Sequence, residues 1–305
     1  MAEAEAPLVQ RALLTSELRR LRAFAHLRQE EAAKTLDWSL SKLIRIEGGT
    51  VGLSTTDLKA LLQLYGVTDE VRIAELVELA RLARTRGWWA SYTHVHNQGY
   101  LNYVSYETSA SIIRMAHGLL IPGLLQTPDY AWALTPEYAE GENEVVRNIV
   151  ELRLDRQEQL FNRDKPPIQF YVLDEAVIRR RVGAPKDYDL MPAQLRHLVD
   201  HASQPNVTIE VIPFGAGVHL GLQGPFALLA FDGELGDVLY LESARRGDLT
   251  LADQANSPLI RRYHEAFEEL RKLSLGPEES IKLIKQVAEE MPQRHRGSGR
   301  GRPQG

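Results

Sequence analysis

The side chains of this sequence best suited to a chemical task are polar and basic groups gathered in one stretch between Gln29 and Gly49. They are Gln29, Ser39, Ser41, Lys42 and Arg45. Amide, hydroxyl, ammonium and guanidinium groups donate hydrogen bonds to phosphate oxygens and to the edges of bases. The N–H groups at a helix N-terminus add to the attraction for phosphate. The stretch therefore predicts recognition of nucleic acid.

Two short helices are expected to position these side chains. The first begins at Gln29 and carries the small residue Ala33, which lets a second helix cross closely. The second follows Ser39, a natural N-cap, and ends at Gly48. Its inward side chains are Leu43 and Ile46. This is the pattern of a helix-turn-helix, in which one helix braces across the DNA backbone and the next lies in the major groove.

Three more helices complete the bundle. Apolar spacing predicts one from Leu14, with Thr15 or Ser16 as N-cap, one from Ser54, and one over about 68–84. Residues 10–66 hold nine Lys and Arg against six Asp and Glu, whereas the whole chain of 305 residues has a net charge of -5. A cationic bundle on an acidic body suits a phosphate backbone. We expect a helix-turn-helix DNA-binding domain over residues 10–84.

The rest of the chain is expected to form a larger α+β domain with a small sheet, over residues 87–290, that senses, dimerises or binds a partner. Strands are predicted at 168–173, 207–213, 226–231 and 238–241. Helices are predicted at 107–117, 143–162, 190–201, 259–272 and 278–290. The tail 292–305 has no apolar residue, so disorder is expected there. The fold class is α+β, with an all-α five-helix bundle in front.

Residues 14–67 resemble the Cro/repressor-type (xenobiotic-response-element) helix-turn-helix. The segments that carry the resemblance are ELRRLRAFAHLRQEEAAKTLDWSLSKLIRIEGG and LKALLQLYGV. The resemblance implies that Gln29 contacts phosphate, that Ser41 and Arg45 read bases, and that Lys42 contacts a base or a phosphate.

The same resemblance implies a structural ion pair between Arg22 and Glu47 that ties the first helix to the recognition helix. Two positions depart from the family. Leu40 stands where a polar base-reading residue is common, and Ile44 where a small polar residue is common. An apolar side chain can still contact the methyl group of thymine, so Leu40 is kept among the expected DNA contacts.

The second domain resembles the sensor-like region of actinobacterial antitoxin-like regulators of the Scr1 type. The segments are YETSASIIRMAHGLLIPGLLQTPDYAWAL, ELRLDRQEQLF, PNVTIEVIPFGAG, GPFALLAF and GPEES. The resemblance implies a small acidic partner protein encoded nearby, and it implies no particular ligand.

Several kinds of site are not expected. Without cysteine there can be no disulfide, thiol catalysis or thiolate metal site. His94 and His96 lack a third ligand at a recognisable spacing, so no metal is predicted. The glycines from Gly215 to Gly224 do not fit a phosphate-binding loop. The pair Asp174–Glu175 is interpreted as a solvated turn. No catalytic motif is found, and neither an enzyme nor a cofactor is expected.

A cluster of aromatic residues leaves two interpretations open. Trp88, Trp89 and Tyr103, with His219 from the glycine-rich loop, could line a small-molecule pocket. Alternatively, the aromatic side chains pack the joint between the domains.

The sequence thus favours a transcriptional regulator that binds double-stranded DNA as a homodimer. No membrane-spanning run and no signal peptide are evident, so a cytoplasmic protein is expected. Two alternatives remain: an antitoxin-like adaptor that acts mainly through protein, and an enzyme in the second domain with DNA-targeted activity.

Overall fold

The computed structural model describes residues 6–137, 143–184, 186–233, 235–242, 249–252 and 257–291. Contacts group the chain into two compact units. The first unit comprises Met1–Ile113, Gln159–Pro167 and Leu228–Arg261, and the second comprises Arg114–Glu158, Ile168–Ala227 and Arg262–Gly305. The predicted tail, 292–305, lies outside the described residues.

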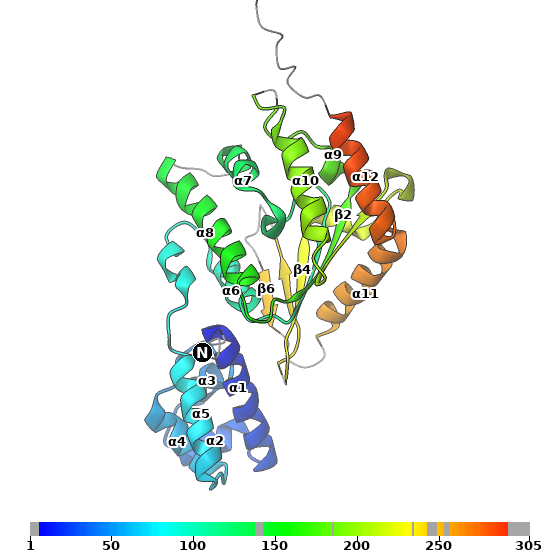
Figure 1. Ribbon diagram of the computed structural model, residues 1–305. Helices are drawn as coiled ribbons and strands as arrows, with labels where there is room; N and C mark the ends of the chain where they lie inside the picture. Colours follow the sequence, from blue (N-terminus) through cyan, green and yellow to red (C-terminus); the bar gives the residue numbers. More distant parts are fainter. Residues whose placement is uncertain are drawn as a thin grey trace, which may run out of the picture. The chain divides into compact units, whose positions relative to one another are not determined.

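Five α-helices open the first unit and form the expected bundle (Figure 1). They are α1 (Pro7–Phe24), α2 (Gln29–Thr35), α3 (Leu40–Glu47), α4 (Thr55–Leu64) and α5 (Glu70–Leu82). Helix α1 starts earlier than the predicted Leu14, so Thr15 and Ser16 lie inside it and do not cap it. Pro7 occupies the first turn, where its missing N–H leaves no helical bond unmade.

Leucines at helical spacing build the core of this bundle. Leu18, Leu43, Leu58, Leu61 and Leu76 are each 0% exposed. Fully burying one such side chain stabilises the fold by about 1.5–3 kcal/mol. Because every helix except the short α2 contributes one of them, and α2 contributes two buried alanines, the five helices are held as one body.

Beyond the bundle, the prediction of a helix over 107–117 was wrong. The helix there is α6 (Gln98–Glu107), preceded by the 3₁₀ turn η1 (Trp88–Tyr92), and residues Ile112–His117 form strand β1. The β-branched pair Ile112–Ile113 favours a strand. Pairing begins at once, because the Ser111 N–H donates to the Ala230 carbonyl at 2.8 Å.

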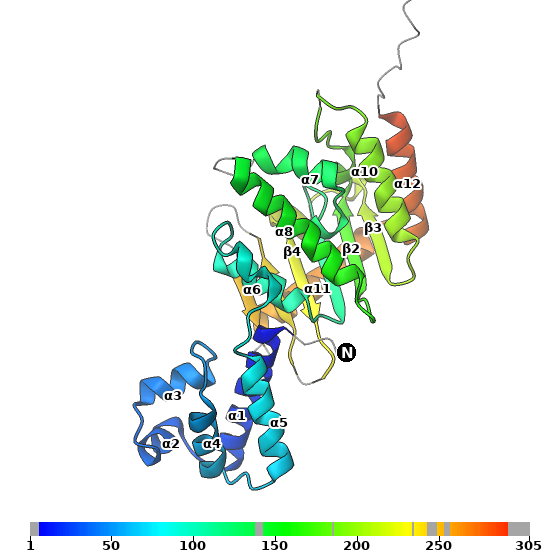
Figure 2. The ribbon, with the colours of Figure 1, turned by 60° about the vertical axis from the view of Figure 1, so that its left-hand side comes forward.

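In the part of the chain that the structure describes, six strands make one sheet in the order β3-β2-β1-β4-β5-β6. The remaining strands are β2 (Ile168–Asp174), β3 (Val207–Ile212), β4 (Phe226–Ala230), β5 (Val238–Leu241) and β6 (Leu249–Ala252). Strands β2 and β3 are parallel, in register from Gln169↔Val207 to Asp174↔Ile212, whereas β5 and β6 are antiparallel. The α+β fold class and the four predicted strands are confirmed, and three of these strands, β2, β3 and β4, are labelled in Figure 2. Strands β1 and β6 were not predicted.

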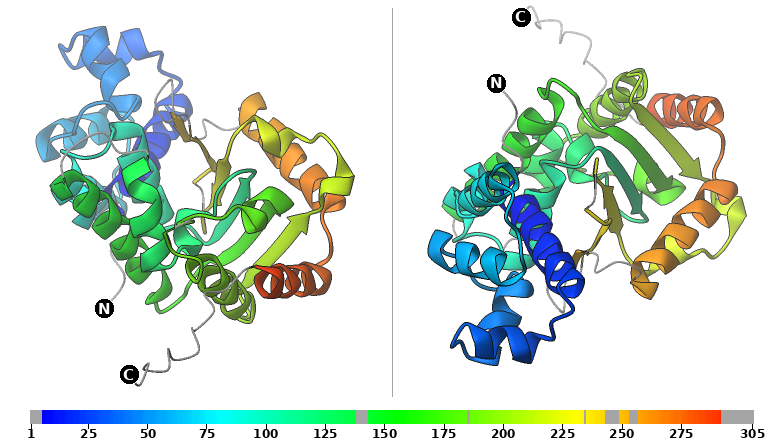
Figure 3. Two further views of the ribbon diagram at one scale, coloured as in Figure 1. Left: turned by 90° about the horizontal axis from the view of Figure 1, so that it is seen from above. Right: turned by 90° about the horizontal axis from the view of Figure 1, so that it is seen from below.

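Helices α9 (Glu175–Arg179) and α10 (Leu190–Ala202) form the crossover that parallel strands β2 and β3 require. Helix α12 (Pro277–Glu290) packs against both α10 and β3, and Figure 3 shows it in red beside α10. The other helices are α7 (Pro128–Leu134), α8 (Asn143–Phe161) and α11 (Pro258–Leu273), with short 3₁₀ turns η2 (Gly123–Leu125), η3 (Thr135–Glu137), η4 (Phe214–Ala216) and η5 (Leu220–Gln223). In the described part of the chain, no helix combines the length and apolar character needed to span a bilayer.

Glutamine side chains secure the irregular segment between β1 and α7. Gln194 accepts from the Thr127 N–H at 2.7 Å and donates to the Leu125 carbonyl at 2.6 Å. Gln157 donates to the carbonyls of Gly123 and Gln126 at 2.7 and 2.9 Å. These bonds satisfy backbone groups that a buried loop would otherwise leave unpaired.

Candidate nucleic-acid interface

The turn between α2 and α3 has the tight geometry of a helix-turn-helix. Asp37 adopts a φ of 54°, a left-handed conformation that a short polar residue tolerates. The Trp38 N–H donates to the Ala33 carbonyl at 2.8 Å. Ala32 and Ala33 are buried, so the small side chains allow the two helices to approach.

Ser39 caps α3, as the sequence predicted. Its hydroxyl oxygen accepts from the Lys42 N–H at 3.2 Å. Leu43 and Ile46 are buried and hold the other side of the helix in the core. Ser39 therefore fixes the start of α3, and its contact with DNA stays a prediction.

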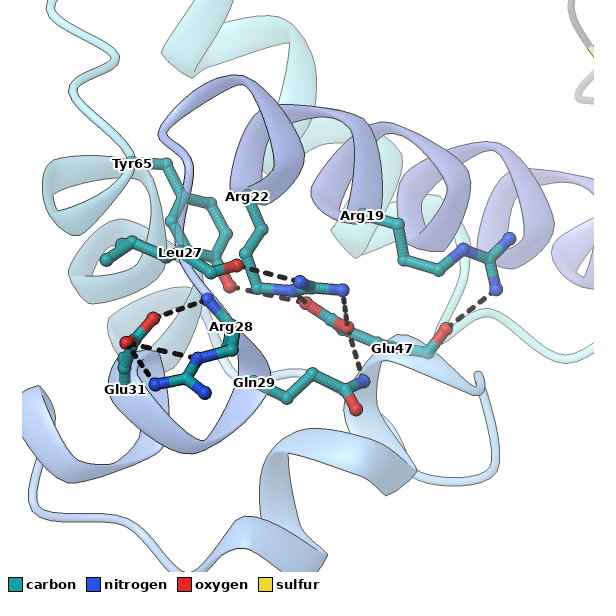
Figure 4. A network of polar contacts seen from close by, with 8 residues as sticks. All are labelled: Arg19, Arg22, Leu27, Arg28, Gln29, Glu31, Glu47 and Tyr65. Atoms are coloured by element: carbon teal, nitrogen blue, oxygen red, sulfur yellow. Dashed lines mark hydrogen bonds and ion pairs between the residues drawn. The ribbon is translucent and has the colours of Figure 1, made fainter.

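Glu47, at the end of α3, is the centre of a polar network that joins α1, α2, α3 and the residue that follows α4 (Figure 4). Arg22 binds it through two bonds, Nε–Oε1 at 2.7 Å and Nη2–Oε2 at 3.1 Å. Gln29 Nε2 donates to Oε2 at 2.7 Å and the Tyr65 hydroxyl donates to Oε1 at 3.3 Å. The carboxylate is 1% exposed, so these four bonds replace its lost hydration.

The electrostatics of this network keep two partners of Glu47 in a fixed charge state. The hydrogen bond to Glu47 raises the pKa of Arg22, so its guanidinium stays charged. Burial, and then the Glu47 charge, raise the pKa of Tyr65, so its phenol stays protonated and can donate. Arg22 also donates to the Leu27 carbonyl at 2.9 Å. The predicted partners Arg22 and Glu47 are thus in contact, and Tyr65 joins them, a contact that the sequence did not predict.

Two of the predicted DNA contacts are engaged within the protein. The amide of Gln29 donates to Glu47, which ties α2 to α3. Lys42 Nζ lies 2.9 Å from Asp57 Oδ1 and 3.7 Å from the centroid of the Trp38 ring. Since Asp57 offsets its charge, Lys42 holds α3 against α4. The contacts of Gln29 and Lys42 with DNA stay predictions.

The outward face of α3 is formed by a small set of side chains. Ser41, Ile44 and Arg45 are exposed, and Leu40 is partly exposed. Within the described residues, the side chains of Ser41 and Arg45 make no hydrogen bond or ion pair. A hydroxyl and a guanidinium are therefore presented on a helix whose opposite side is anchored in the core.

Comparison with known families agrees with this geometry. Residues 13–76 match a family described as a helix-turn-helix domain, which indicates a DNA-binding regulator. Residues 100–286, more than half of the chain, match the family described as a domain of unknown function (DUF5753). The chain belongs to the DUF5753 family. No curated protein and no solved structure matches it.

The four residues proposed to line a ligand pocket are divided between the two units. In the first unit, the rings of Trp88 and Trp89 meet edge-on with centroids 5.7 Å apart, and Tyr103 of the DUF5753 domain stacks on Tyr240 at 4.1 Å. His219 belongs to the second unit. Each has the local partners of a packed side chain, and the pocket stays a prediction.

The interpretation of Asp174 and Glu175 as a solvated turn was wrong. Both are buried at the carboxyl end of β2, where the loop 213–224 covers them. Asp174 Oδ1 caps α9 by accepting from the Ala176 N–H at 2.7 Å, and Oδ2 lies 3.0 Å from His219 Nε2. Glu175 accepts from the Phe214 N–H at 2.8 Å. These carboxylates fasten the glycine-rich loop, and the sequence held no signal that they would be covered.

Among the described residues, no three His, Asp or Glu side chains are grouped so that they could hold a metal ion. His96 instead stacks on Tyr100, with ring centroids 4.5 Å apart.

Proposed function

We propose that the chain is a sequence-specific transcriptional regulator that binds double-stranded DNA in the cytoplasm as a homodimer. Helix α3 enters the major groove of each half-site, and half-sites lie one helical turn apart, about 34–36 Å. The DUF5753 domain joins the two copies and receives the signal, either a small ligand or a small protein partner.

The observation that carries this proposal is the exposed face of α3. Arg45 presents five N–H donors that no carboxylate of the described residues occupies, and Ser41 lies one turn before it. Arginine is the side chain best suited to the two acceptors of guanine. The buried Glu47 network supplies the rigid support that base reading needs.

A second observation supports the protein-binding role of the DUF5753 domain. In loop 213–224, three apolar residues are exposed to solvent: Phe214 is 58% exposed, Val218 94% and Leu222 50%. Its anchors are buried, since His219 binds Asp174 and the Phe214 N–H binds Glu175. Apolar groups displayed by a fastened loop are typical of a surface that binds another chain.

The test is a fluorescence-anisotropy titration of the full chain with duplexes selected from a random pool, and with scrambled duplexes, at two salt concentrations. Wild-type protein should prefer the selected duplex, and its affinity should fall with salt. Arg45→Ala should lose about 1–3 kcal/mol of that preference, because one bidentate base contact is removed.

Lys59→Ala is the matched control, since Lys59 is an exposed cation of the same bundle on α4. It should leave the ratio of specific to non-specific affinity unchanged. Equal binding of selected and scrambled duplexes by the wild-type protein would exclude a sequence-specific regulator. It would favour the alternative of an antitoxin-like adaptor that acts mainly through protein. Two protomers bound per palindromic duplex would support the dimer, and one would contradict it.

A further inference from the structure

The exposed face of α3 carries two parallel rows of side chains. Leu40 and Ile44 are four residues apart and form an apolar row. Ser41 and Arg45, also four apart, form a polar row beside it. Residues four apart are neighbours on a helix surface, whereas consecutive residues project about 100° apart. The two rows therefore lie side by side, and a groove wide enough to accept the helix can contact both Ile44 and Arg45.

Stability does not account for an isoleucine at position 44. Its side chain is 47% exposed, while Leu43 and Ile46 on the opposite side already anchor the helix at 0% and 3% exposure. A β-branched residue is also a weaker helix former than the unbranched or polar residues that suit an exposed position. Ile44 therefore lowers the stability of α3 relative to alanine and leaves apolar surface in water.

Few polar side chains of this region are available to contact base edges together with Arg45. The Lys42 ammonium is paired with Asp57 and lies over Trp38, and the Gln29 amide is engaged by Glu47. The central contact surface of α3 thus consists of one hydroxyl, one guanidinium and an apolar row. In the major groove, the apolar group that base pairs offer is the 5-methyl of thymine.

We propose that Ile44 is a specificity-determining residue that packs on the 5-methyl group of a thymine adjacent to the base contacted by Arg45. This inference rests on the proposed DNA-binding function and goes beyond it, because it names the base. Burying one methyl group is worth about 0.8 kcal/mol, which corresponds to about a fourfold preference for thymine over uracil.

The experiment uses the full chain and duplexes selected by it from a random pool. Each thymine of the selected site is replaced in turn by deoxyuridine, which removes only the methyl group. At one thymine, wild-type protein should bind the uracil duplex about fourfold more weakly. Ile44→Ala should bind the thymine and uracil duplexes equally at that position and still depend on Arg45.

Val71→Ala is the matched control, because Val71 is a β-branched residue 68% exposed on α5 of the same bundle. It should keep the fourfold thymine preference. Thermal unfolding of Ile44→Ala should occur at or slightly above the wild-type temperature, which shows that the bundle is intact.

The outcomes separate the two claims. If selected duplexes bind specifically but no uracil replacement weakens binding, or if Ile44→Ala keeps the preference, the thymine contact is overturned while the regulator stands. If no duplex is enriched, both are overturned.

Discussion

The helix-turn-helix bundle and the DUF5753 domain each fasten a surface segment to a buried carboxylate, but with different partners. In the bundle, Glu47 is held by Arg22, Gln29 and Tyr65, and it fixes α3. In the DUF5753 domain, Asp174 is held by His219 and by one backbone N–H, and it fixes loop 213–224.

The two regions should also differ in how their stability depends on pH. The partners Arg22 and Tyr65 keep their protons throughout the physiological pH range, because their pKa values are raised. In the DUF5753 domain, burial lowers the pKa of His201 on α10. We therefore expect the bundle to be a support insensitive to pH in that range and the DUF5753 domain to change its stability with pH.

The largest effect should come from breaking the Glu47 network. Glu47→Ala leaves the guanidinium of Arg22, 18% exposed, without its carboxylate. Loss of one partner of such a buried pair costs about 3–5 kcal/mol. Hydrogen exchange of the full chain should show this as lost protection in α1–α4, with loop 213–224 unchanged.

Glu78→Ala is the control for this prediction. Glu78 pairs with Arg81 on the surface of the same bundle, and both side chains are more than half exposed. Its removal should leave protection unchanged. Equal protection in Glu47→Ala and Glu78→Ala would show that the network is not the anchor of α3.

A smaller effect is expected from Asp174→Ala. The substitution removes the cap of α9 and leaves His219, with a side chain 2% exposed, without its hydrogen bond. Loss of a cap and of a buried hydrogen bond together cost about 2–3 kcal/mol. Faster exchange should appear in residues 175–179 and 213–224, and the bundle should keep its protection.

Asp187→Ala provides the comparison, because Asp187 accepts a backbone bond only within an exposed turn, from Asp189. If the amides of residues 213–224 exchange no faster in Asp174→Ala than in Asp187→Ala, the Asp174 carboxylate does not hold this loop, and its glycine-rich backbone does.

The same contrast governs what could be predicted from the sequence. The bundle is made of local helices, and its signals are short-range: the Ser39 cap, the small Ala33, and leucines at helical spacing. The exposure of Ser41 and Arg45 followed from this pattern, whereas the pairing of Lys42 with Asp57 did not. The start of α1 was missed because Pro7 can begin a helix without a capping side chain.

The DUF5753 domain depends on contacts between distant residues. Strand β1 is flanked by helix-forming sequence, and its identity is decided by pairing of Ser111 with Ala230. Asp174 and Glu175 follow a strand, as many surface turns do, and only the loop from Phe214 onward buries them. The periodicity of apolar residues along the chain cannot predict burial by a segment that is distant in the sequence.

The smallest expected effect is a dependence of the stability of α10 on pH. Burial first, and then the neighbouring His197, lower the pKa of His201 to about 4 from its usual 6.5, and the two rings lie 4.4 Å apart. Between these values the unfolded chain binds a proton that the folded chain does not, so stability is full above pH 6.5 and falls as the pH falls toward 4. Because His201 is partly exposed, its contribution to the free energy of unfolding should fall by only about 1 kcal/mol between pH 7 and pH 5.

Hydrogen exchange of α10 in the full chain, at pH 7 and pH 5 after correction for intrinsic rates, measures this loss. His201→Gln should lessen the difference between the two pH values, whereas His94→Gln, at an exposed position, should not. In the bundle, hydrogen bonding by Arg20 lowers the pKa of Glu17 below its usual 4.5, so its contribution is lost only in more acidic solution. If α1 lost as much protection as α10 between pH 7 and pH 5, the contrast between a pH-insensitive support and a responsive domain would fail.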